Sequence, residues 1–565
     1  MDWTPTQLPY RQTGYFSKII TDYLERAGSL APYYTHPVSA EGIEAALLAR
    51  QGSPVNRPVL VAALKEQYKL IGSSAKAAAT ALASGGGKAD RNDGGEDEPD
   101  SDSLGISPVG RNIDRLLETN TFTICTAHQP AIFTGPLYFI YKILHTIKLA
   151  DELAKKYPQH QFVPVFYMGS EDADLEELGK IYLDQEKLVW DTKQTGAVGR
   201  MKPKGLEKIL NRVEGELTVQ PFGKELVDRV KEIYLGSPDI QTATFRLLHH
   251  LFADYGLVVL IPDNASLKRL MIPVFEEDLF QGIPTRVVNE TIGRLSIHYK
   301  VQANPRPINL FYLKDDLRGR IERVGDVFKV HDSQLEFDEA GIREELSTYP
   351  ERFSPNVILR GLFQETILPN IAFIGGGGET AYWLELKDLF IHYRVPFPML
   401  ILRNSFLLVE AAWKEKLERA GLELTEIFKP ESALVNELVK RESQQQLSLS
   451  AEISTAHDIY EKLKALARPV DPTLVQHVEA LQARALEPLQ QLEKKLLKAE
   501  KRKFIDQQRQ IHALKSALFP PNGLGLQERI DNFMPWYAAK GPAFIKDLYA
   551  HSLTLEQEFV VLGAE

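Results

Sequence analysis

A single cysteine, Cys125, is present in the 565 residues of this sequence. One thiol excludes an intramolecular disulfide and a cysteine-based zinc cluster, and such sparse cysteine usage is typical of a reducing compartment. The first residues lack a basic segment followed by an apolar core, and no stretch of 18 uninterrupted apolar residues occurs. We therefore expect a cytoplasmic protein that does not insert into a membrane.

Positive charge is not in excess either. The formal net charge is -10 at pH 7, so no broad basic field is expected, although a local basic pocket for a phosphorylated ligand remains compatible with it. Two nucleotide-binding motifs are also missing: G-x-x-x-x-G-K-[ST] does not occur, and no G-x-G-x-x-G follows the first predicted strand. These absences disfavour a nucleic-acid partner, a P-loop kinase and a simple dehydrogenase.

The composition is that of an ordinary globular protein, with 44% hydrophobic and 25% charged residues, but the length exceeds what one core can fill. We divide the chain into a helical N-terminal layer (1–83), an acidic glycine-rich insert (84–105), a core with insertions (106–440), a helical coiled-coil hairpin (441–518) and a C-terminal segment that returns to the core (519–565). The insert has too few apolar residues to offset its ordering entropy and is predicted to be disordered. A regulatory docking segment is the alternative for it.

The predicted core alternates short β-rich runs with longer helical ones. This pattern is typical of βαβ units, so we expect an α/β protein with a largely parallel, Rossmann-like sheet. The segments 185–250 and 279–364 are too long for simple crossovers and are predicted to be insertions that wall a cleft. Strands are expected at residues 121–126, 162–168, 257–261, 308–313, 371–374 and 398–402.

The last third of the chain has the spacing of a coiled coil. Apolar residues alternate at intervals of four and three from Leu449 to Ala467, and the spacing resumes from Leu474 toward Leu518. A proline-containing turn at 468–472 separates the two runs, so two long helices should form an antiparallel hairpin. One hairpin leaves much of each helix exposed, and the arm is therefore expected to pair two chains into a homodimer; packing on its own body is the alternative.

Polar turns directly follow several predicted strands. Ligands of an open α/β sheet bind outside the carboxyl ends of its strands, so we expect these turns to converge on one site. The turns are His128-Gln129-Pro130, Glu171-Asp172-Ala173-Asp174, Asp263-Asn264, Gly375-Gly376-Gly377-Gly378-Glu379 and Arg403-Asn404-Ser405.

The first of these turns precedes a predicted helix start. Thr134 is expected to cap a helix that opens at Gly135, where free N–H groups suit a phosphate or a carboxylate. His128 could then neutralise charge on a phosphate or transfer a proton near neutral pH, and a turn histidine bonded to the backbone is the alternative. Tyr138 and Lys142 share one face of this helix, although a lysine more often extends to solvent.

The second turn places three carboxylates within four residues, from Glu171, Asp172 and Asp174. They could hold a magnesium ion, accept hydrogen bonds from sugar hydroxyls, or raise the pKa of one carboxyl for base catalysis. Acidic turns are common, so this motif is weakly specific by itself.

Four consecutive glycines, residues 375–378, are rarer. They permit positive φ and close approach of a ligand, and a helix expected from Glu379 to about Tyr393 points its N-terminus at the same place. Tyr382 could stack on a ring, whereas Trp383 is expected in the core. Cys125 lies inside a predicted strand and is interpreted as a buried small hydrophobe rather than a nucleophile.

Taken together, these motifs resemble the family of bacillithiol biosynthesis cysteine-adding enzymes, also described as cysteine ligases. The resemblance runs from Leu8 to near the C-terminus and skips the acidic insert. The residues that carry it are Leu8-Pro9-Tyr10-Arg11, Phe16-Ser17, His128-Gln129, Phe133-Thr134-Gly135-Pro136-Leu137-Tyr138, Glu171-Asp172-x-Asp174, Gly375 to Glu379 with Ala381-Tyr382-Trp383, Arg403-Asn404-Ser405, Pro521-Asn522-Gly523 and Gln527-Glu528-Arg529.

The resemblance implies a Rossmann-like core with two connecting-peptide insertions and a coiled-coil domain that pairs two chains. It implies addition of L-cysteine to glucosaminyl malate as the last step of bacillithiol formation, with a site for ATP or ADP; participation of Mg²⁺ is left open. We expect catalytic roles for His128, Glu171, Asp172 and Asp174. Substrate or nucleotide contacts are expected from Gln129, Thr134, Gly135, Tyr138, Lys142, Gly375, Gly376, Gly377, Gly378, Glu379, Tyr382, Arg403 and Asn404.

Two positions depart from the pattern of the family. Ala173 stands where the family has histidine between the acidic residues, and Ala127 stands where it has glycine before His-Gln. The missing imidazole motivates an alternative, a non-catalytic or partner-dependent homologue that binds a sugar acid or a nucleotide. A nucleotidyl transferase acting on another small acid is a third hypothesis.

Overall fold

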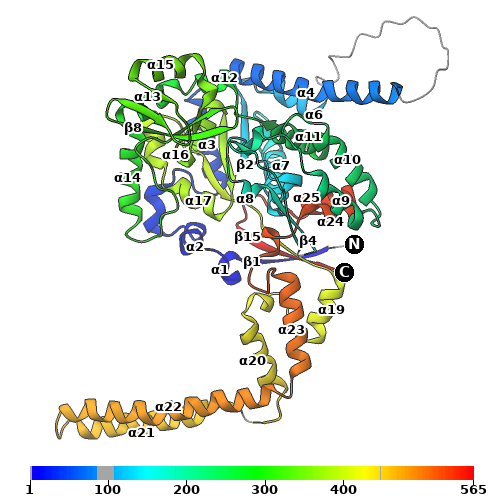
Figure 1. Cartoon of the computed structure of the whole chain (residues 1–565). Helices are drawn as coiled ribbons and strands as arrows, with labels where there is room; N and C mark the ends of the chain where they lie inside the picture. Colours follow the sequence, from blue (N-terminus) through cyan, green and yellow to red (C-terminus); the bar gives the residue numbers. More distant parts are fainter. Residues whose placement is uncertain (1–2, 85–106, 185, 446) are drawn as a thin grey trace, which may run out of the picture.

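The computed structural model describes residues 3–84, 107–184, 186–445 and 447–565. Nearly all of the predicted acidic insert, residues 85–105, lies outside these ranges. A large mixed body carries a helical stalk, from which a long helical hairpin projects (Figure 1). Within the described ranges, no helix combines the length and the apolar character needed to cross a bilayer.

A five-stranded parallel sheet forms the centre of the body. Its order is β13 (Met399–Leu402), β12 (Asn370–Gly375), β2 (Thr121–His128), β3 (Gln161–Met168) and β6 (Val258–Leu260), and every neighbouring pair is parallel. All but the last residue of β2 are buried, as expected for a strand covered on both faces. The prediction of a Rossmann-like α/β core is therefore confirmed.

Helices cover both faces of this sheet. The helix α7 (Tyr138–Lys156) connects β2 to β3 and packs on both strands. The other helices of the body are α1 (Tyr10–Thr13), α2 (Lys18–Leu24), α3 (Ala40–Gln51), α4 (Arg57–Ser84), α6 (Pro108–Arg115), α8 (Leu175–Leu178), α9 (Glu207–Leu217), α10 (Gly223–Leu235), α11 (Ile240–Phe252), α12 (Ala265–Arg269), α13 (Ile272–Gln281), α14 (Ile283–Leu295), α15 (Glu339–Thr348), α16 (Val357–Ile367), α17 (Gly377–Leu384), α18 (Lys387–Tyr393), α24 (Phe533–Lys540) and α25 (Pro542–His551).

One predicted core strand belongs elsewhere. The run at 308–313 forms β7 (Leu310–Lys314), which pairs with β8 and β11 in a separate sheet and not with the parallel core. A tight turn, with Asp315 in the left-handed region, joins β7 to β8, so β7 is paired locally as a hairpin. The full order of this second, antiparallel sheet is β10 (Glu336–Phe337), β9 (Val327–Val330), β8 (Leu317–Val324), β7 and β11 (Phe353–Pro355).

The N-terminal layer is not wholly helical, because it begins with the strand β1 (Trp3–Pro9). β1 pairs antiparallel with β15 (Glu558–Ala564), which also pairs parallel with β14 (Phe406–Val409). Prolines at positions 5 and 9 concealed this strand in the sequence, and they are tolerated because β1 lies at the edge of its sheet. The two ends of the described chain therefore lie side by side at the base of the body (Figure 1).

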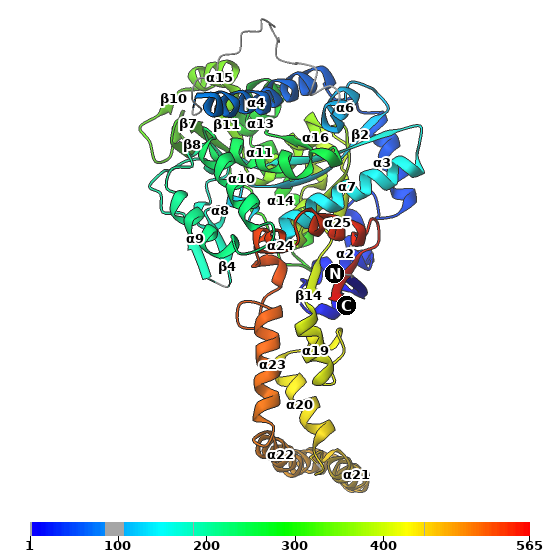
Figure 2. The same cartoon turned by 90° about the vertical axis from the view of Figure 1, so that its right-hand side faces the viewer.

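The stalk contains α19 (Ala411–Arg419), α20 (Glu431–Glu442) and α23 (Ile505–Leu518), and the projecting arm is the hairpin of α21 (Ser450–Ala467) and α22 (Thr473–Lys501) (Figure 2). The predicted antiparallel hairpin is confirmed. The prediction that its second helix continues toward Leu518 is wrong, because the chain turns at 502–504 and Phe504 packs against the core. No side chain of α21 is buried, which leaves its surface available to a second chain. Pairing of two chains through the arm stays a prediction.

Candidate active-site cleft at the carboxyl edge of the parallel sheet

A cleft with a cavity volume of about 670 Å³ lies outside the carboxyl ends of β2, β3 and β12. It brings together His128 and the glycine run, two features more than 240 positions apart in the sequence. The second predicted insertion contributes much of the wall, through residues such as Arg318, Ser354 and Arg360, whereas residues 185–250 contribute none. Of the expected site residues, the cleft is lined by His128, Gln129, Tyr138, Lys142, Glu171, Asp172, Gly376, Gly377, Gly378, Glu379, Tyr382 and Arg403.

His128 is a neutral hydrogen-bond acceptor in this cleft. Its Nδ1 lies 2.9 Å from the carbonyl oxygen of Gln129, which can only accept, so Nδ1 carries the hydrogen and Nε2 accepts from the Tyr138 hydroxyl at 3.0 Å. Burial, together with the nearby Lys142 ammonium, lowers the pKa of His128 to about 4. His128 was expected to neutralise a phosphate charge or to titrate near neutral pH. In the structure it is instead an uncharged hydrogen-bond acceptor.

The start of α7 differs from its prediction. Thr134 does not cap the helix: it lies in the left-handed region with φ 69° and is fully buried, and the helix begins at Tyr138 with no side-chain cap. The C-terminal segment occupies this start instead, because Asn532 Nδ2 donates to the Gly135 carbonyl at 2.8 Å and the Leu137 N–H donates to the Asp531 carbonyl at 2.9 Å. The expected anion seat at Gly135 is therefore not supported.

Lys142 is buried rather than extended to solvent, with 2% of its surface exposed. Its ammonium donates to the Ala127 carbonyl at 2.9 Å and to the carboxylate of Glu379. The same carboxylate accepts from the Gly376 N–H at 2.8 Å. Burial alone would raise the pKa of Glu379, but Lys142 and this N–H hold it below its usual value. The pair joins α7 to the first turn of α17 beneath the cleft.

The glycine run supplies space rather than unusual backbone angles. Gly375 ends β12 and Gly376 precedes α17, and none of the four glycines has a positive φ. A Cβ atom at Gly378 would meet nothing within 4 Å, and one at Gly376 would meet only the Glu379 carboxylate and Arg403. The run therefore leaves open room at the N-terminus of α17, where a ligand can approach the backbone closely.

The segment after the glycines is two helices, α17 and α18, rather than the single helix expected to about Tyr393. Trp383 stacks on Phe373 with ring centroids 4.5 Å apart and is fully buried, which confirms its core role. Tyr382 faces the cleft and accepts a hydrogen bond from Arg360. Cys125 is also fully buried, and burial raises the pKa of its thiol, so its interpretation as a buried hydrophobe is confirmed.

The three carboxylates of the second turn have different partners and do not converge. Glu171 pairs with the buried Lys268 and accepts from the Ser354 hydroxyl at 3.1 Å. Asp172 accepts from Gln129 Nε2 at 3.0 Å. Asp174 caps α8 and lies outside the main cleft. In the described ranges, no group of three or more His, Cys, Asp or Glu residues is arranged to hold a metal ion, so the magnesium alternative has no support here.

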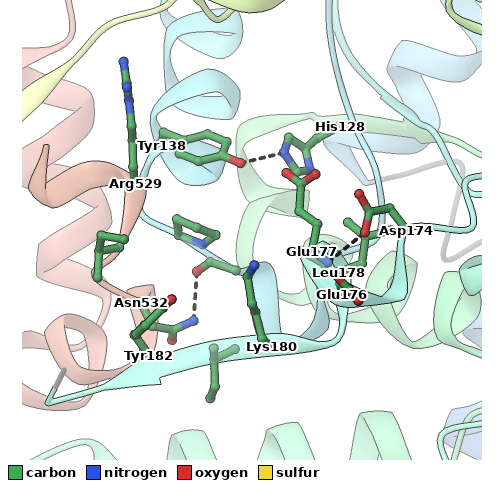
Figure 3. Close-up of a pocket in the computed structure, with 15 residues that line it drawn as sticks. His128, Tyr138, Asp174, Glu176, Glu177, Leu178, Lys180, Tyr182, Arg529 and Asn532 are labelled. Carbon is green, nitrogen blue, oxygen red and sulfur yellow. Dashed lines mark hydrogen bonds between the residues drawn. The ribbon is translucent and has the colours of Figure 1, made fainter. Parts of the chain in front are cut away.

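A smaller chamber of about 410 Å³ adjoins the main cleft. The two share the lining residues His128, Tyr138, Glu177 and Arg529, and Figure 3 shows the hydrogen-bonded His128–Tyr138 pair on the side of the smaller chamber. The chamber is also lined by Gly135 and by a cluster of acidic residues, Asp174, Glu176 and Glu177. An ammonium group would be favoured on that acidic side.

Arg403 and Asn404, adjacent in sequence, have different roles. Arg403 is 5% exposed and forms a two-point ion pair with Glu528, with N–O distances of 2.9 and 2.8 Å. Its Nε is buried, faces the cleft near Gly376 and has no partner within the described structure. Asn404 lines neither chamber, because its side chain donates to the Leu553 carbonyl and its N–H to His145 Nδ1. Gly375 and Thr134 likewise lie behind the cleft wall.

Three cationic residues of the cleft were missed by the sequence reasoning: Arg318 on β8, Arg360 on α16 and Arg529 near the C-terminus. None of them follows a strand of the parallel sheet, and that position was the signal used. Arg529 belongs to a motif that carried the family resemblance, so that motif could have identified it.

Comparison with known proteins identifies relatives of the whole chain. A family described as "Bacillithiol biosynthesis BshC, N-terminal Rossmann-like domain" matches residues 101–404, and "Bacillithiol biosynthesis BshC, C-terminal coiled-coil domain" matches residues 406–564. A Flavobacterium johnsoniae protein is 37% identical over 98% of this chain and 99% of its own length. A Cytophaga hutchinsonii protein is 38% identical over 91% of this chain and 90% of its own. Both are named "Putative cysteine ligase BshC".

Similarity to solved structures is weak. The arginyl-tRNA synthetase of Thermus thermophilus is 12% identical over 77% of this chain and 82% of its own, with a TM-score of 0.18. A likeness at this level supports no conclusion about function.

Proposed function

The chain belongs to the BshC family of bacillithiol biosynthesis, and we propose that it is a ligase that joins the carboxyl group of L-cysteine to the amino group of glucosaminyl malate, the last step of that pathway. The observation that carries the proposal is the pairing of unlike groups in one cleft. Arg318, Arg360 and Arg403 suit the carboxylates of both reactants, and the neutral Nε2 of His128 suits an amine.

Amide formation needs a better leaving group than the oxygen of a free carboxylate, so we propose that ATP is consumed. The open room over Gly376 and Gly378, the N-terminus of α17 and the unpaired Nε of Arg403 fit a phosphate group. These residues would hold the phosphate, which would convert the cysteine carboxyl oxygen into a leaving group. The described residues offer no comparable metal-ligand set, so no Mg²⁺ site is assigned.

His128 is proposed to take up the proton that the amine loses. Its Nε2 accepts from the Tyr138 hydroxyl, and an amine that displaces this hydroxyl would reach the same lone pair. The C–N bond then forms as the bond from the acyl carbon to the activated oxygen breaks, and the amine proton passes to Nε2. The acidic side of the smaller chamber would attract an arriving ammonium group, which releases one proton to solvent before it attacks, so Nε2 takes up only the second.

The variant His128→Ala tests this assignment. We expect product formation to fall by about 10²-fold, the lower end of the usual contribution of a general base because a group with a pKa of about 4 is a weak base at neutral pH, with the circular dichroism spectrum unchanged. Amide product is measured by mass spectrometry after incubation with ATP, L-cysteine and glucosaminyl malate. His392→Ala serves as the control, because this histidine lies on α18 and lines neither chamber. Wild-type turnover by His128→Ala would exclude the role proposed for His128.

The alternative is a homologue that binds these ligands without joining them, favoured by Ala173 in the acidic turn. The backbone N–H of Ala173 donates to Asp172 Oδ1 at 2.7 Å, so this position contributes no side-chain donor or acceptor. Thermal-shift titration of the wild-type protein with each reactant separates the two functions. Stabilisation by ligands without any amide product would favour the alternative.

A further inference from the structure

Arg318 is an arginine of the cleft wall whose guanidinium donates no hydrogen bond to any other described residue. It lies on β8 of the antiparallel insertion sheet, and its guanidinium stacks over the Phe311 ring at 3.7 Å from the ring centroid. Its Nε is fully shielded from solvent by protein atoms and has no hydrogen-bond partner. Burial lowers the pKa of Arg318, but a guanidinium stays charged at every physiological pH.

The acidic residues beside Arg318 do not satisfy it. Glu171 and Asp172 attract its charge. Glu171, however, is bonded to Lys268 and Ser354, and Asp172 accepts from Gln129 and from backbone N–H groups. Leaving a buried donor without a partner is unfavourable. Arg318 therefore presents to the cleft a charged guanidinium that stacks on Phe311 and that no described protein acceptor engages.

A second unpaired donor lies in another part of the same cleft. Arg403 leaves its Nε free beside Gly376 and the start of α17. Arg318 instead lies beside the acidic turn after β3. The cleft thus offers two separate positions for anions, as a reaction between two carboxylate-bearing compounds requires.

We propose that Arg318 determines substrate specificity by binding a carboxylate of the sugar acid that accepts the cysteinyl group. This inference rests on the function proposed above. The cysteine carboxylate is consumed in the reaction, so it belongs beside the activating phosphate at α17. The malyl carboxylates persist from substrate to product, and a planar guanidinium held by an aromatic ring suits such a permanent planar anion.

Kinetics of Arg318→Met provide the first test. Loss of a charge-assisted hydrogen bond is expected to raise the KM for glucosaminyl malate by about 10- to 100-fold, with the KM for L-cysteine within about twofold of wild type. Arg320→Met is the matched control. Arg320 lies two residues after Arg318 on β8 and does not line the cleft, so this substitution removes the same charge outside the cleft. An unchanged KM for glucosaminyl malate, or equal effects of the two substitutions, would overturn the inference.

Binding of single anions provides a second test that needs no catalysis. Calorimetry with L-malate should show about 10- to 100-fold weaker binding to Arg318→Met, whereas binding of inorganic phosphate should be unchanged. Weaker phosphate binding with unchanged malate binding would identify a phosphate position and overturn the inference. Malate binding through Arg318 in a protein that forms no amide would instead support the inference while the proposed function fails.

The conservative variant Arg318→Lys guards against misfolding of Arg318→Met. It keeps the positive charge but lacks the planar pair of donors, so its malate affinity should lie between those of wild type and Arg318→Met. Wild-type malate affinity in Arg318→Lys together with unchanged affinity in any folded Arg318→Met would argue that the guanidinium makes no contact with the ligand.

Discussion

Two buried arginine–glutamate pairs lie at opposite edges of the parallel sheet. They differ in whether the Nε atom of the arginine has a hydrogen-bond partner. At the amino edge, Arg50 of α3 pairs with Glu365, and its Nε donates to the carbonyl of Asn370, the first residue of β12. At the carboxyl edge, Arg403 pairs with Glu528, but its Nε has no partner among the described residues. Both arginines are at most 5% exposed.

This difference separates a structural arginine from one that is available to a ligand. Every nitrogen of the Arg50 guanidinium is bonded within the protein, and the partner Glu365 also accepts from Gln364 and Asn370. The guanidinium of Arg50 and the carboxylate of Glu365 therefore have their partners within the protein, although the side-chain oxygen of the neighbouring Gln364 has none among the described residues. At the carboxyl edge, an anion bound in the cleft as proposed above would supply the partner that the Nε of Arg403 lacks among the described residues.

The largest expected effect concerns the amino edge. Arg50→Met should lower the free energy of unfolding by about 3–5 kcal/mol, because it leaves the Glu365 carboxylate buried without its countercharge. Urea unfolding followed by circular dichroism measures the change. The double variant Arg50→Met/Glu365→Gln should recover at least half of the loss. A change below about 1 kcal/mol for the single variant would show that the ion pair of Arg50 with Glu365 is not required for stability.

The second prediction concerns the pH dependence of stability and a residue at the carboxyl edge, His145, whose hydrogen bonds are all made within the protein. His145 on α7 accepts the N–H of Asn404 at Nδ1 and donates from Nε2 to the Thr554 carbonyl, so its ring is held neutral. Burial lowers its pKa from 6.5 to about 4. Between these values the unfolded chain binds more protons than the folded one, so stability is full above pH 6.5 and falls as the pH drops toward 4.

His145 is expected to contribute about 3 kcal/mol to that loss on acidification. Unfolding free energies of wild type and His145→Gln, measured from pH 7 to pH 4, give its share as the difference between the two curves. Glutamine can still donate to Thr554 but does not titrate. Parallel curves over this range would mean that His145 is protonated in the folded protein.

The smallest expected effect concerns the Nε atom of Arg403. Arg403→Lys keeps a positive charge beside Glu528 but removes Nε, and kcat/KM should fall by about 10- to 100-fold through loss of one charge-assisted hydrogen bond. Steady-state kinetics and urea unfolding are measured on the same preparation, and the loss of stability should be smaller than that of Arg50→Met. A wild-type value of kcat/KM in Arg403→Lys would show that the Nε of Arg403 does not bind a reactant, and Arg403 would then be a structural residue like Arg50.

The parts of the fold that could be predicted are those determined by local pattern. The five strands of the parallel sheet were expected close to their observed bounds, because each is a short apolar run between turns and helices. The hairpin arm followed from its spacing of four and three and from the proline-containing turn. Errors arose where contacts with distant segments decide the structure. The proline-containing β1 is a strand because it pairs with β15, and α22 ends before Phe504, which packs against the core.

The candidate site shows the same division. Placing His128 and the glycine run at one edge needed only the rule that parallel strands end on the same side. The cap expected of Thr134 failed because Asn532 and Asp531 occupy the start of α7 from 397 and 394 positions farther along the chain. Lys142 was expected to contact a ligand, with extension to solvent as the alternative; its burial against Glu379 was not foreseen because that partner lies on another helix.

The sequence by itself determined the strands of the parallel sheet, the hairpin arm, the edge of the sheet at which polar turns gather and the family to which the chain belongs. Only the tertiary structure decided which donors of those turns are already bonded and which remain free for a ligand, as Arg403 and Asn404 illustrate. Secondary structure follows from neighbouring residues, whereas the satisfaction of a buried charge depends on partners such as Glu528, which packing brings from 125 positions away.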